Sequence, residues 1–302
     1  MKQCLLYLIF GLCISMLLPA QELNDKALWF NEQHLLERAK ILSSENFEGR
    51  CTDTQGNAKA RAYIISQFVA LGVEGLEGAY EQEFSFKYRD ESITGTNILA
   101  EIKGKKHPET YMVISAHYDH LGIQNNKVFN GADDNASGVS ALISFAEYLS
   151  QHQPNYSVIF AAFDAEEIGL EGAKHFVKAL ENRPVLVNIN LDMIGRSASN
   201  ELYVVGARYT KALEVLIDDF NPHTSVILKQ GHDGTDDKLD WTSASDHKYF
   251  HQKGIPFLYF GNEDHEAYHT PEDDFEDLTK SFYINATQTI LMIVKEIDKN
   301  GL

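Results

Sequence analysis

Histidine and carboxylate residues gather at five places in the sequence, each next to an apolar segment. The clusters are HYDH (117–120), GADDNASG (131–138), DAEE (164–167), DMIGR (192–196) and GNEDHEAYHTPEDD (261–274). One such cluster alone is typical of a helix cap or of a solvated loop in an acidic protein. Several carboxylates gathered in one cleft repel one another, so each must protonate or stay in water unless a cation neutralises them.

The mixture of histidine with aspartate and glutamate, without cysteine, favours zinc, with manganese and cobalt as alternatives. Two histidines and three carboxylates exceed the three protein ligands that one catalytic zinc needs. They fit two ions about 3.5–4 Å apart that share a carboxylate. The adjacent glutamates of DAEE (164–167) then have separate tasks, one as a metal ligand and one in proton transfer.

The elements that must position these clusters are short apolar strands. Four segments rich in Val, Ile and Phe predict strands buried on both faces: 111–116, 157–163, 185–191 and 256–260. Helical patterns lie between them, which indicates an α/β fold with a mixed, mostly parallel central sheet and helices on both faces. In such sheets ligands bind beyond the carboxyl ends of the strands, where the clusters begin.

Further elements flank this parallel core. The segments 80–88 and 96–104 are predicted as edge strands that precede it. Apolar residues at helical spacing predict helices over 58–72, 139–149, 171–182 and 284–299. No linker or repeat interrupts the pattern, so we expect residues 21–302 to form one catalytic domain.

Residues 1–20 have the pattern of a secretory signal peptide. Lys2 precedes an apolar run over 5–18, and the segment ends in Ala20. The run is shorter than the roughly 18 residues that a membrane span needs. We therefore expect cleavage before Gln21 and export to the periplasm or beyond, with no membrane attachment after cleavage.

The net charge and the cysteine content limit which partners the chain can bind and what can stabilise its fold. The chain carries a formal net charge of −18, which disfavours binding to nucleic acid and to anionic membranes. After removal of Cys4 and Cys13 with the signal peptide, only Cys51 remains, so no internal disulfide is expected. The oligomeric state is not readable from the sequence.

The clusters, taken in order, resemble a known family. AHYDH, GADDNASG, FDAEEIGLEGA, NLDMIGR and AYHTPEDD occur in the order and approximate spacing of the co-catalytic zinc exopeptidases. That family includes bacterial leucyl aminopeptidases and glutamate carboxypeptidases, with glutaminyl cyclases as single-zinc relatives. The resemblance runs from NFEGRCTDTQGNAKARAYI (46–64) to the final helix.

The resemblance implies a set of metal ligands. Asp134 would bridge two zinc ions. His117 and Asp192 would complete one site, and Glu167 and His269 would complete the other. The family's D-x-x-S-G spacing selects Asp134.

Three residues compete with these ligands: Asp133 with Asp134, His120 with His117, and His265 with His269. The motif HTPED favours His269, because it places Asp273 downstream, where family members often have an acid. His265 is interpreted as a polar loop residue.

The resemblance also implies two supporting roles. Glu166 would be the general base. Asp119 would not bind metal itself but would contact His117 and orient its ring. In this family the peptide bond after the bridging aspartate, here Asp134–Asn135, is often cis.

Residues of the substrate pocket are less closely specified. Asp246 and His247 resemble a family segment that walls the pocket, and either contact substrate or cap the short helix that follows. Arg196 is the one arginine placed to hold a substrate carboxylate, or it pairs with surface acid. The loop 231–240 is acidic but lacks the ligand spacing of an EF-hand, so a solvated loop is expected.

The predicted function is a zinc-dependent aminopeptidase that hydrolyses peptides with two metal ions. Acidic or carbonyl groups could hold the ammonium of such a substrate, and the intact glutamate pair 166–167 favours hydrolysis. The alternatives are a single-zinc glutaminyl-peptide cyclotransferase, a carboxypeptidase or dipeptidase of the same family, and a non-catalytic binding domain.

Overall fold

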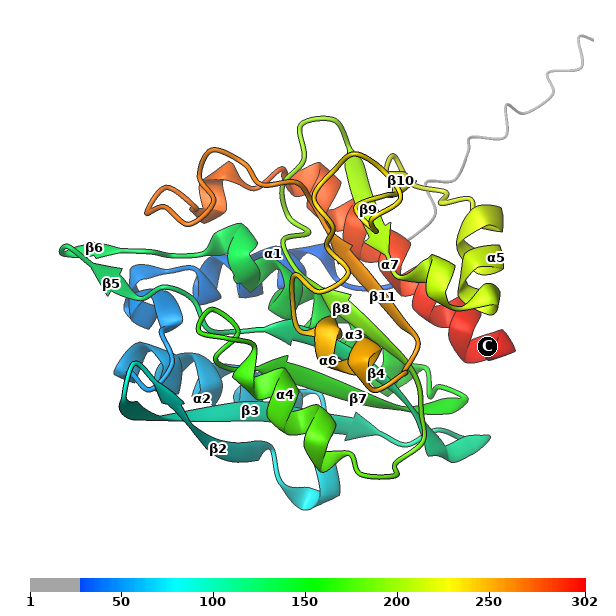
Figure 1. Cartoon of the computed structure of the whole chain (residues 1–302), viewed down its shortest axis with the longest axis horizontal. Helices are drawn as coiled ribbons and strands as arrows, with labels where there is room; N and C mark the ends of the chain where they lie inside the picture. Colours follow the sequence, from blue (N-terminus) through cyan, green and yellow to red (C-terminus); the bar gives the residue numbers. More distant parts are fainter. Residues whose placement is uncertain (1–27) are drawn as a thin grey trace, which may run out of the picture.

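A computed structural model describes residues 28–302, and the predicted signal peptide lies outside them. Within these residues nine strands form one sheet in the order β1-β3-β7-β4-β8-β11-β9-β10, with β2 paired to β3 (Figure 1). The strands are β1 (Glu74–Gly75), β2 (Glu81–Tyr88), β3 (Glu91–Ile102), β4 (His107–His117), β7 (Tyr156–Phe163), β8 (Val185–Leu191), β9 (Glu201–Val205), β10 (Ile227–Gln230) and β11 (Phe257–Gly261). A hairpin of β5 (Ile123–Gln124) and β6 (Lys127–Val128) stands apart.

The four strands predicted as the buried core are neighbours and run parallel. β7 pairs with β4, β4 with β8, and β8 with β11, each in parallel register. Their carboxyl ends therefore lie at one edge of the sheet. Together with the helices on both faces, this confirms the predicted fold class.

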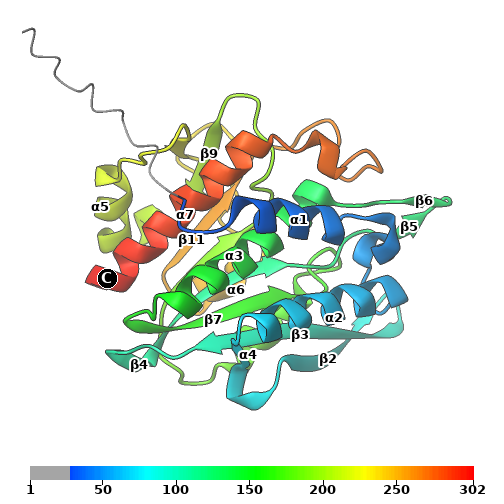
Figure 2. The ribbon, with the colours of Figure 1, turned by 180° about the vertical axis from the view of Figure 1, so that it is seen from behind.

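Helices cover the sheet on two sides. α1 (Glu32–Leu42), α2 (Gln55–Ala70), α3 (Gly138–Gln151) and α7 (Lys280–Asn300) lie on the face seen in Figure 2. α4 (Glu171–Ala179) and α6 (His247–Gln252) lie on the opposite face, and α5 (Lys211–Asp219) lies beside the β9 end of the sheet (Figure 1). None of the helices in residues 28–302 is long and apolar enough to cross a membrane.

The core is divided by the alternation of side chains along each strand. In β4, Met112, Ile114 and Ala116 belong to the larger core cluster, which includes apolar residues of α1, α2, α3 and α7. Tyr111 and Val113 belong to the cluster on the α4 and α6 side. Successive residues of a strand point to opposite faces, so a strand buried on both sides must be apolar at every position.

One prediction about the sheet was wrong. The segment 96–104 was expected at an edge, but β3 is hydrogen-bonded on one side to β2 and on the other to β7, both antiparallel. Ile98 and Ala100 are fully buried, as an interior strand requires. The sequence pattern also missed β9 and β10; the residues of β10 are exposed or half-buried, so they carry no clear apolar signal.

Candidate metal centre and active site

The strand ends bring the predicted clusters together at the carboxyl edge of the sheet. His117 is the last residue of β4, Asp164 follows β7, Asp192 follows β8 and Asn262 follows β11. Asp134 reaches the same place from the turn that precedes α3. These side chains come from segments up to 145 positions apart (117 to 262) and meet only because the strands are parallel neighbours.

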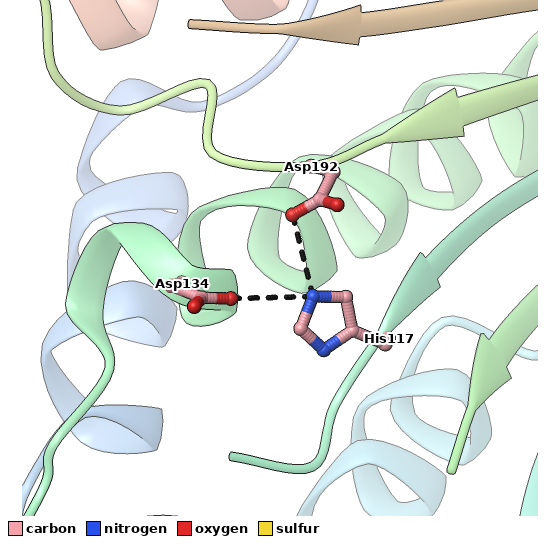
Figure 3. Close-up of side chains that lie close together, drawn as sticks. All are labelled: His117, Asp134 and Asp192. Carbon is pink, nitrogen blue, oxygen red and sulfur yellow. Dashed lines mark hydrogen bonds and ion pairs between the residues drawn. The ribbon is translucent and has the colours of Figure 1, made fainter. Parts of the chain in front are cut away.

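The first cluster consists of His117, Asp134 and Asp192 (Figure 3). The Nε2 atom of His117 lies 3.3 Å from Asp134 Oδ1 and 3.3 Å from Asp192 Oδ1. All three residues are buried. One imidazole nitrogen thus faces two carboxylate oxygens at equal distance.

The second cluster uses the other oxygen of Asp134. His269 Nε2 lies 3.2 Å from Asp134 Oδ2 and 3.3 Å from Glu167 Oε2. His120 belongs here as well: its Nδ1 lies 2.7 Å from Glu167 Oε1 and 3.6 Å from Asp134 Oδ2. In the sequence analysis His120 was the alternative to His117 as a metal ligand. In the structure it lies beside His269 instead.

These spacings test whether a zinc ion fits. Ligand atoms about 2.0–2.1 Å from a tetrahedral ion lie roughly 3.3 Å from one another. The distances of 3.2–3.3 Å around His117 and around His269 match that edge length. His120, Asp134 and Glu167 form a second group whose possible ligand atoms all lie within 4.8 Å of one another, so His120 and His269 are both candidates for the nitrogen ligand of this cluster. The donor set therefore fits zinc in both clusters, with Asp134 contributing one oxygen to each.

The charges in the site are strongly coupled. Burial raises the pKa of the Asp134 carboxyl, but His120, His117 and His269 outweigh burial and lower that pKa well below its usual value. Hydrogen bonds to Asp134 and Glu167 raise the pKa of His269 to about 10. The carboxylates thus favour positive charge beside them, which a divalent cation supplies.

The backbone around Asp134 is fixed by a buried carboxylate. Asp273 accepts hydrogen bonds from the amides of Asp133 and Asp134 at 3.0–3.1 Å. The Asp134–Asn135 peptide bond is cis, as the resemblance implied. Gly131 has φ of 57°, and a Cβ there would lie 2.1 Å from the carbonyl oxygen of Asp134, so only glycine fits.

Two carboxylates hold the turn that carries Glu166 and Glu167. Asp119 Oδ1 accepts the amide of Glu166 at 3.1 Å, and Asp119 Oδ2 accepts the amide of Glu167 at 3.3 Å. Asp164 Oδ1 accepts the amide of Ala165, which has a φ of 59°. This turn directs both glutamates towards the metal clusters.

The contact between Asp119 and His117 differs from the one expected. His117 Nδ1 lies 3.2 Å from the backbone oxygen of Asp119 and 3.8 Å from its carboxylate. The carbonyl is therefore the group that orients the ring. The carboxylate acts instead on the glutamate turn, because it accepts the two amides of Glu166 and Glu167.

Arg50 is a structural residue of the site that the sequence reading missed. Its side chain is buried and donates hydrogen bonds only to backbone carbonyls, which belong to Leu42, Tyr118, Asn130, Gly131 and Asp134. The carbonyls of residues 118, 131 and 134 lie in the two loops that carry His117 and Asp134. The position of Arg50 in the quoted motif NFEGR was the one available signal, and it does not reveal these partners.

The competing aspartate and histidine pair with each other, outside both clusters. Asp133 Oδ1 accepts the amide of Gly195 at 2.7 Å, and Asp133 Oδ2 lies 3.2 Å from His265 Nε2. His265 lies in a loop, as predicted, but its side chain is only 13% exposed. It is a half-buried polar loop residue that faces Asp133.

The helix-cap alternative for Asp246 is wrong. Asp246 precedes α6 but its side chain forms no capping hydrogen bond, and both carboxylate oxygens are buried without a partner among the described residues. Burial raises the pKa of this carboxyl to about 7. His247 packs against Phe257 and Tyr259, and its Nε2 lies 2.8 Å from the carbonyl oxygen of Trp241.

A pocket of about 90 Å³ opens onto the two clusters. Aromatic side chains of Trp241, Tyr259 and Tyr268 line it together with Glu166. The acidic loop 231–240 supports this wall, because His232 stacks on Trp241 with ring centroids 3.5 Å apart. Its carboxylates accept hydrogen bonds from nearby backbone and side-chain groups, and no metal-type cluster occurs there among residues 28–302.

This fold and site define a class of protein: an α/β sheet that presents two histidine–carboxylate clusters at its carboxyl edge. The family model described as "Peptidase family M28" matches residues 97–294, about two thirds of the chain. The chain therefore belongs to peptidase family M28, which confirms the resemblance inferred from the motifs.

Curated relatives carry related names. The chain is 31% identical over 223 residues to "Aminopeptidase YwaD" of Bacillus subtilis, an alignment that covers 68% of this chain and 45% of the relative. It is 34% identical over 201 residues to a "Probable zinc metalloprotease" of Pyrenophora tritici-repentis, covering 61% of this chain and 46% of the relative. The aligned part thus spans less than half of the length of either relative.

Solved structures share the fold. The zinc aminopeptidase BSAP from Bacillus subtilis superposes with a TM-score of 0.73 at 20% identity, covering 92% of this chain and 98% of that one. Glutaminyl cyclase from Porphyromonas gingivalis superposes with a TM-score of 0.72 at 19% identity, covering 89% and 99%. At this identity the likeness establishes the fold only. The reaction has to be inferred from the residues of the site.

Proposed function

We propose that the chain is a zinc-dependent aminopeptidase that holds two zinc ions. His117, Asp134 and Asp192 would hold one ion, and Asp134, Glu167 and His269 the other. The observation that carries this proposal is the pair of 3.2–3.3 Å triads that share Asp134 through its two oxygens. The name of the Bacillus subtilis relative supports the aminopeptidase reading.

The residues of the chain divide the work of hydrolysis between them. Bound zinc supplies Lewis acidity to the attacking water and to the scissile carbonyl. Glu166 takes the proton of the water as it attacks and then returns that proton to the leaving amine. Burial raises the pKa of the Glu166 carboxyl well above its usual value, which makes its carboxylate a stronger base. The small aromatic-walled pocket excludes bulk water around these groups.

The free amino terminus of a peptide is the group that the acidic pocket favours. Asp264 also lines the pocket and is neither a proposed zinc ligand nor the proposed base, so its negative charge attracts an ammonium group. An N-blocked peptide lacks that charge. We therefore expect hydrolysis of free peptides and aminoacyl anilides and none of their N-acetylated forms.

The decisive experiment compares Glu166→Gln with Glu171→Gln, a control in the same segment whose carboxylate pairs with Lys174. Glu166→Gln should retain two zinc ions per chain by elemental analysis and lose activity by about 10³-fold or more, because the base is absent. Glu171→Gln should keep both. Equal activity of the two variants would remove Glu166 from the reaction.

Removal of the metal gives a second readout that does not depend on activity. Dialysis against a chelator should lower the midpoint of thermal unfolding, because ions that bind only the folded state stabilise it. Zinc should restore the midpoint in the native chain and restore less in His117→Ala. A midpoint of thermal unfolding that does not change when zinc is removed or added would contradict the metal assignment.

A glutaminyl cyclase is the second candidate, because the Porphyromonas gingivalis enzyme has the same fold, with a TM-score of 0.72. That reaction uses one zinc and expels ammonia from a glutaminyl peptide. Counting zinc ions and assaying an aminoacyl anilide against a glutaminyl peptide separates the two. One ion with ammonia release assigns the cyclase; two ions with anilide cleavage assign the aminopeptidase.

Export and the single catalytic domain form part of the same proposal. The pattern of residues 1–20 supports a cleaved signal peptide. Amino-terminal sequencing of protein from the exported fraction should begin at Gln21. Protein that retains Met1 in the cell would contradict export.

A further inference from the structure

A second, larger pocket adjoins the metal pocket. Its volume is about 420 Å³, and it lies between the loop that follows β8 and the loop that follows β11. Asn262 and Asp264 line both pockets, so the two are adjacent. The metal pocket of about 90 Å³ is much smaller than this second pocket, so we expect part of a peptide substrate to occupy the neighbouring space.

Four buried side-chain atoms of residues that line this second pocket have no hydrogen-bond partner among the described residues. Two are the ring nitrogens of His265, which faces Asp133, and the other two are Nη1 of Arg196, a donor, and Oδ1 of Asn262, an acceptor. Asn262 is only 5% exposed, and its Nδ2 donates to the carbonyl oxygen of Arg196 at 2.8 Å. The hydrogen bond ties the two residues together. A buried polar group without a partner calls for an explanation, and a water, an ion or a ligand can supply the missing hydrogen bond.

The carboxylates around the pocket leave the charge of Arg196 available. Glu201 pairs with Lys229, and Glu263 pairs with Lys238. Asp264 and Glu266, which also line the pocket, are exposed to solvent, so water and salt screen them. No ion pair of Arg196 occurs in residues 28–302, although four carboxylates surround the pocket.

We propose that this pocket binds the C-terminal carboxylate of a short peptide, with Arg196 as the residue that determines specificity. Guanidinium and carboxylate groups match as two parallel hydrogen bonds. Asn262 Oδ1 accepts the amide hydrogen of the preceding peptide unit. This inference rests on the proposed aminopeptidase function and adds the substrate class, namely di- to tetrapeptides with a free carboxyl end.

The length limit follows from chain geometry. Arg196 is four residues beyond the ligand Asp192, so their Cα atoms lie at most about 14 Å apart. Each extended peptide residue advances about 3.3–3.6 Å. With the reach of the arginine side chain included, one to three residues after the scissile bond bring the carboxylate to the guanidinium.

The test uses matched pairs of peptides. Leu-Gly-Gly and Leu-Gly-Gly-amide differ only in the terminal charge, and the native zinc-loaded chain should cleave the free acid with about 10- to 100-fold higher kcat/KM. Arg196→Gln should reduce that ratio to about 1–3, mainly through a higher KM for the free acid. Arg196→Lys should give an intermediate ratio, because the lysine ammonium keeps the positive charge but cannot form the two parallel hydrogen bonds of a guanidinium.

Arg208→Gln is the matched control, because Arg208 lies outside the pocket and pairs with Asp233. It should keep the native ratio. The amide Leu-Asp-Gly-amide carries its carboxylate on a side chain and should be cleaved as slowly as Leu-Gly-Gly-amide. Rapid cleavage of this peptide would overturn the assignment to the C-terminal carboxylate, and equal kcat/KM for acid and amide in the native chain would overturn the proposal.

Leucine anilide separates failure of this inference from failure of the proposed function. It has no carboxylate, so its cleavage by the native chain reports on the metal centre alone. Cleavage of the anilide without a preference for the free acid contradicts only the role of Arg196. Absence of cleavage of the anilide and of every peptide contradicts the aminopeptidase itself.

Discussion

The two flanks of the metal pocket differ in how their buried polar groups are paired. On the flank of β4 and β7, Arg50 and Asp164 each make several hydrogen bonds to groups of known position. On the flank of β8 and β11, Asp246 and parts of Arg196 and Asn262 are buried without a partner among residues 28–302. Asp164 on one flank and Asp246 on the other are 1% and 0% exposed, so burial alone does not distinguish them.

The difference indicates separate tasks. A satisfied polar network rigidifies its surroundings and holds ligands in a fixed geometry. A buried group without a partner costs stability, and proteins keep such groups where a ligand supplies the missing bond. The β4 and β7 flank therefore holds His117, Glu166 and Glu167 in a fixed geometry. The β8 and β11 flank contributes the proposed ligands Asp192 and His269 and is also where we expect substrate.

The largest expected effect compares Arg50→Met with Arg196→Met. Methionine at position 50 leaves the carbonyls of Leu42, Tyr118 and Gly131 unpaired in the interior, which should cost about 3–5 kcal/mol of unfolding free energy. Methionine at position 196 should cost less than about 1 kcal/mol, because no carboxylate in residues 28–302 forms an ion pair with the guanidinium and its Nη1 has no hydrogen-bond partner there. Urea unfolding of the metal-free chains measures both. Equal losses would show that the flanks do not differ.

The next effect compares two buried aspartates. Asp164 accepts hydrogen bonds from Thr52, Asn57 and Thr96 among others. In Asp164→Asn one acceptor oxygen is replaced by an NH₂ group, which faces other donors, so the variant should lose about 2–4 kcal/mol of unfolding free energy. Asp246 accepts none, and burial already raises its pKa to about 7. Asp246→Asn should leave the unfolding free energy of the metal-free chain at neutral pH unchanged or slightly higher. A loss as large as that of Asp164→Asn would mean that Asp246 has a partner.

The contrast also shows what the sequence could predict. Parallel strands place the residues after them at one edge, so the meeting of His117, Asp192 and the DAEE turn followed from apolar segments and their order. The partners of Arg50 could not be predicted in this way. Apart from Leu42, they are backbone carbonyls of loops 68–84 positions away, and no side-chain pattern marks a carbonyl as an acceptor.

The same limit explains the corrected details. Whether the carbonyl or the carboxylate of Asp119 lies nearer to His117 depends on the local turn rather than on residue type. The placement of β3 inside the sheet depends on β2 folding back on it, which follows from a turn near residues 89–90 with positive φ. Sequence spacing specifies which strands exist more reliably than which strand lies at the edge.

The smallest expected effect concerns pH and the aromatic wall of the substrate flank. Burial lowers the pKa of His247 to about 4, below its usual value near 6.5. Between these values the unfolded chain binds a proton that the folded chain does not. The contribution of His247 to stability is therefore complete above pH 6.5 and is lost as pH falls towards 4, by up to about 1.4 kcal/mol per pH unit.

His247→Gln tests this contribution, because its side-chain amide can still donate to the carbonyl of Trp241. Relative to the native chain, the variant should lose less unfolding free energy between pH 6.5 and pH 4, by about 3 kcal/mol in total. His152→Gln, at an exposed histidine, should follow the native curve. Parallel curves for the native chain and His247→Gln would mean that His247 accepts a proton in the folded state. The wall of Trp241 and Tyr259 would then be wetter than the rest of this flank, and the division between a satisfied scaffold and a dry substrate side would be weaker.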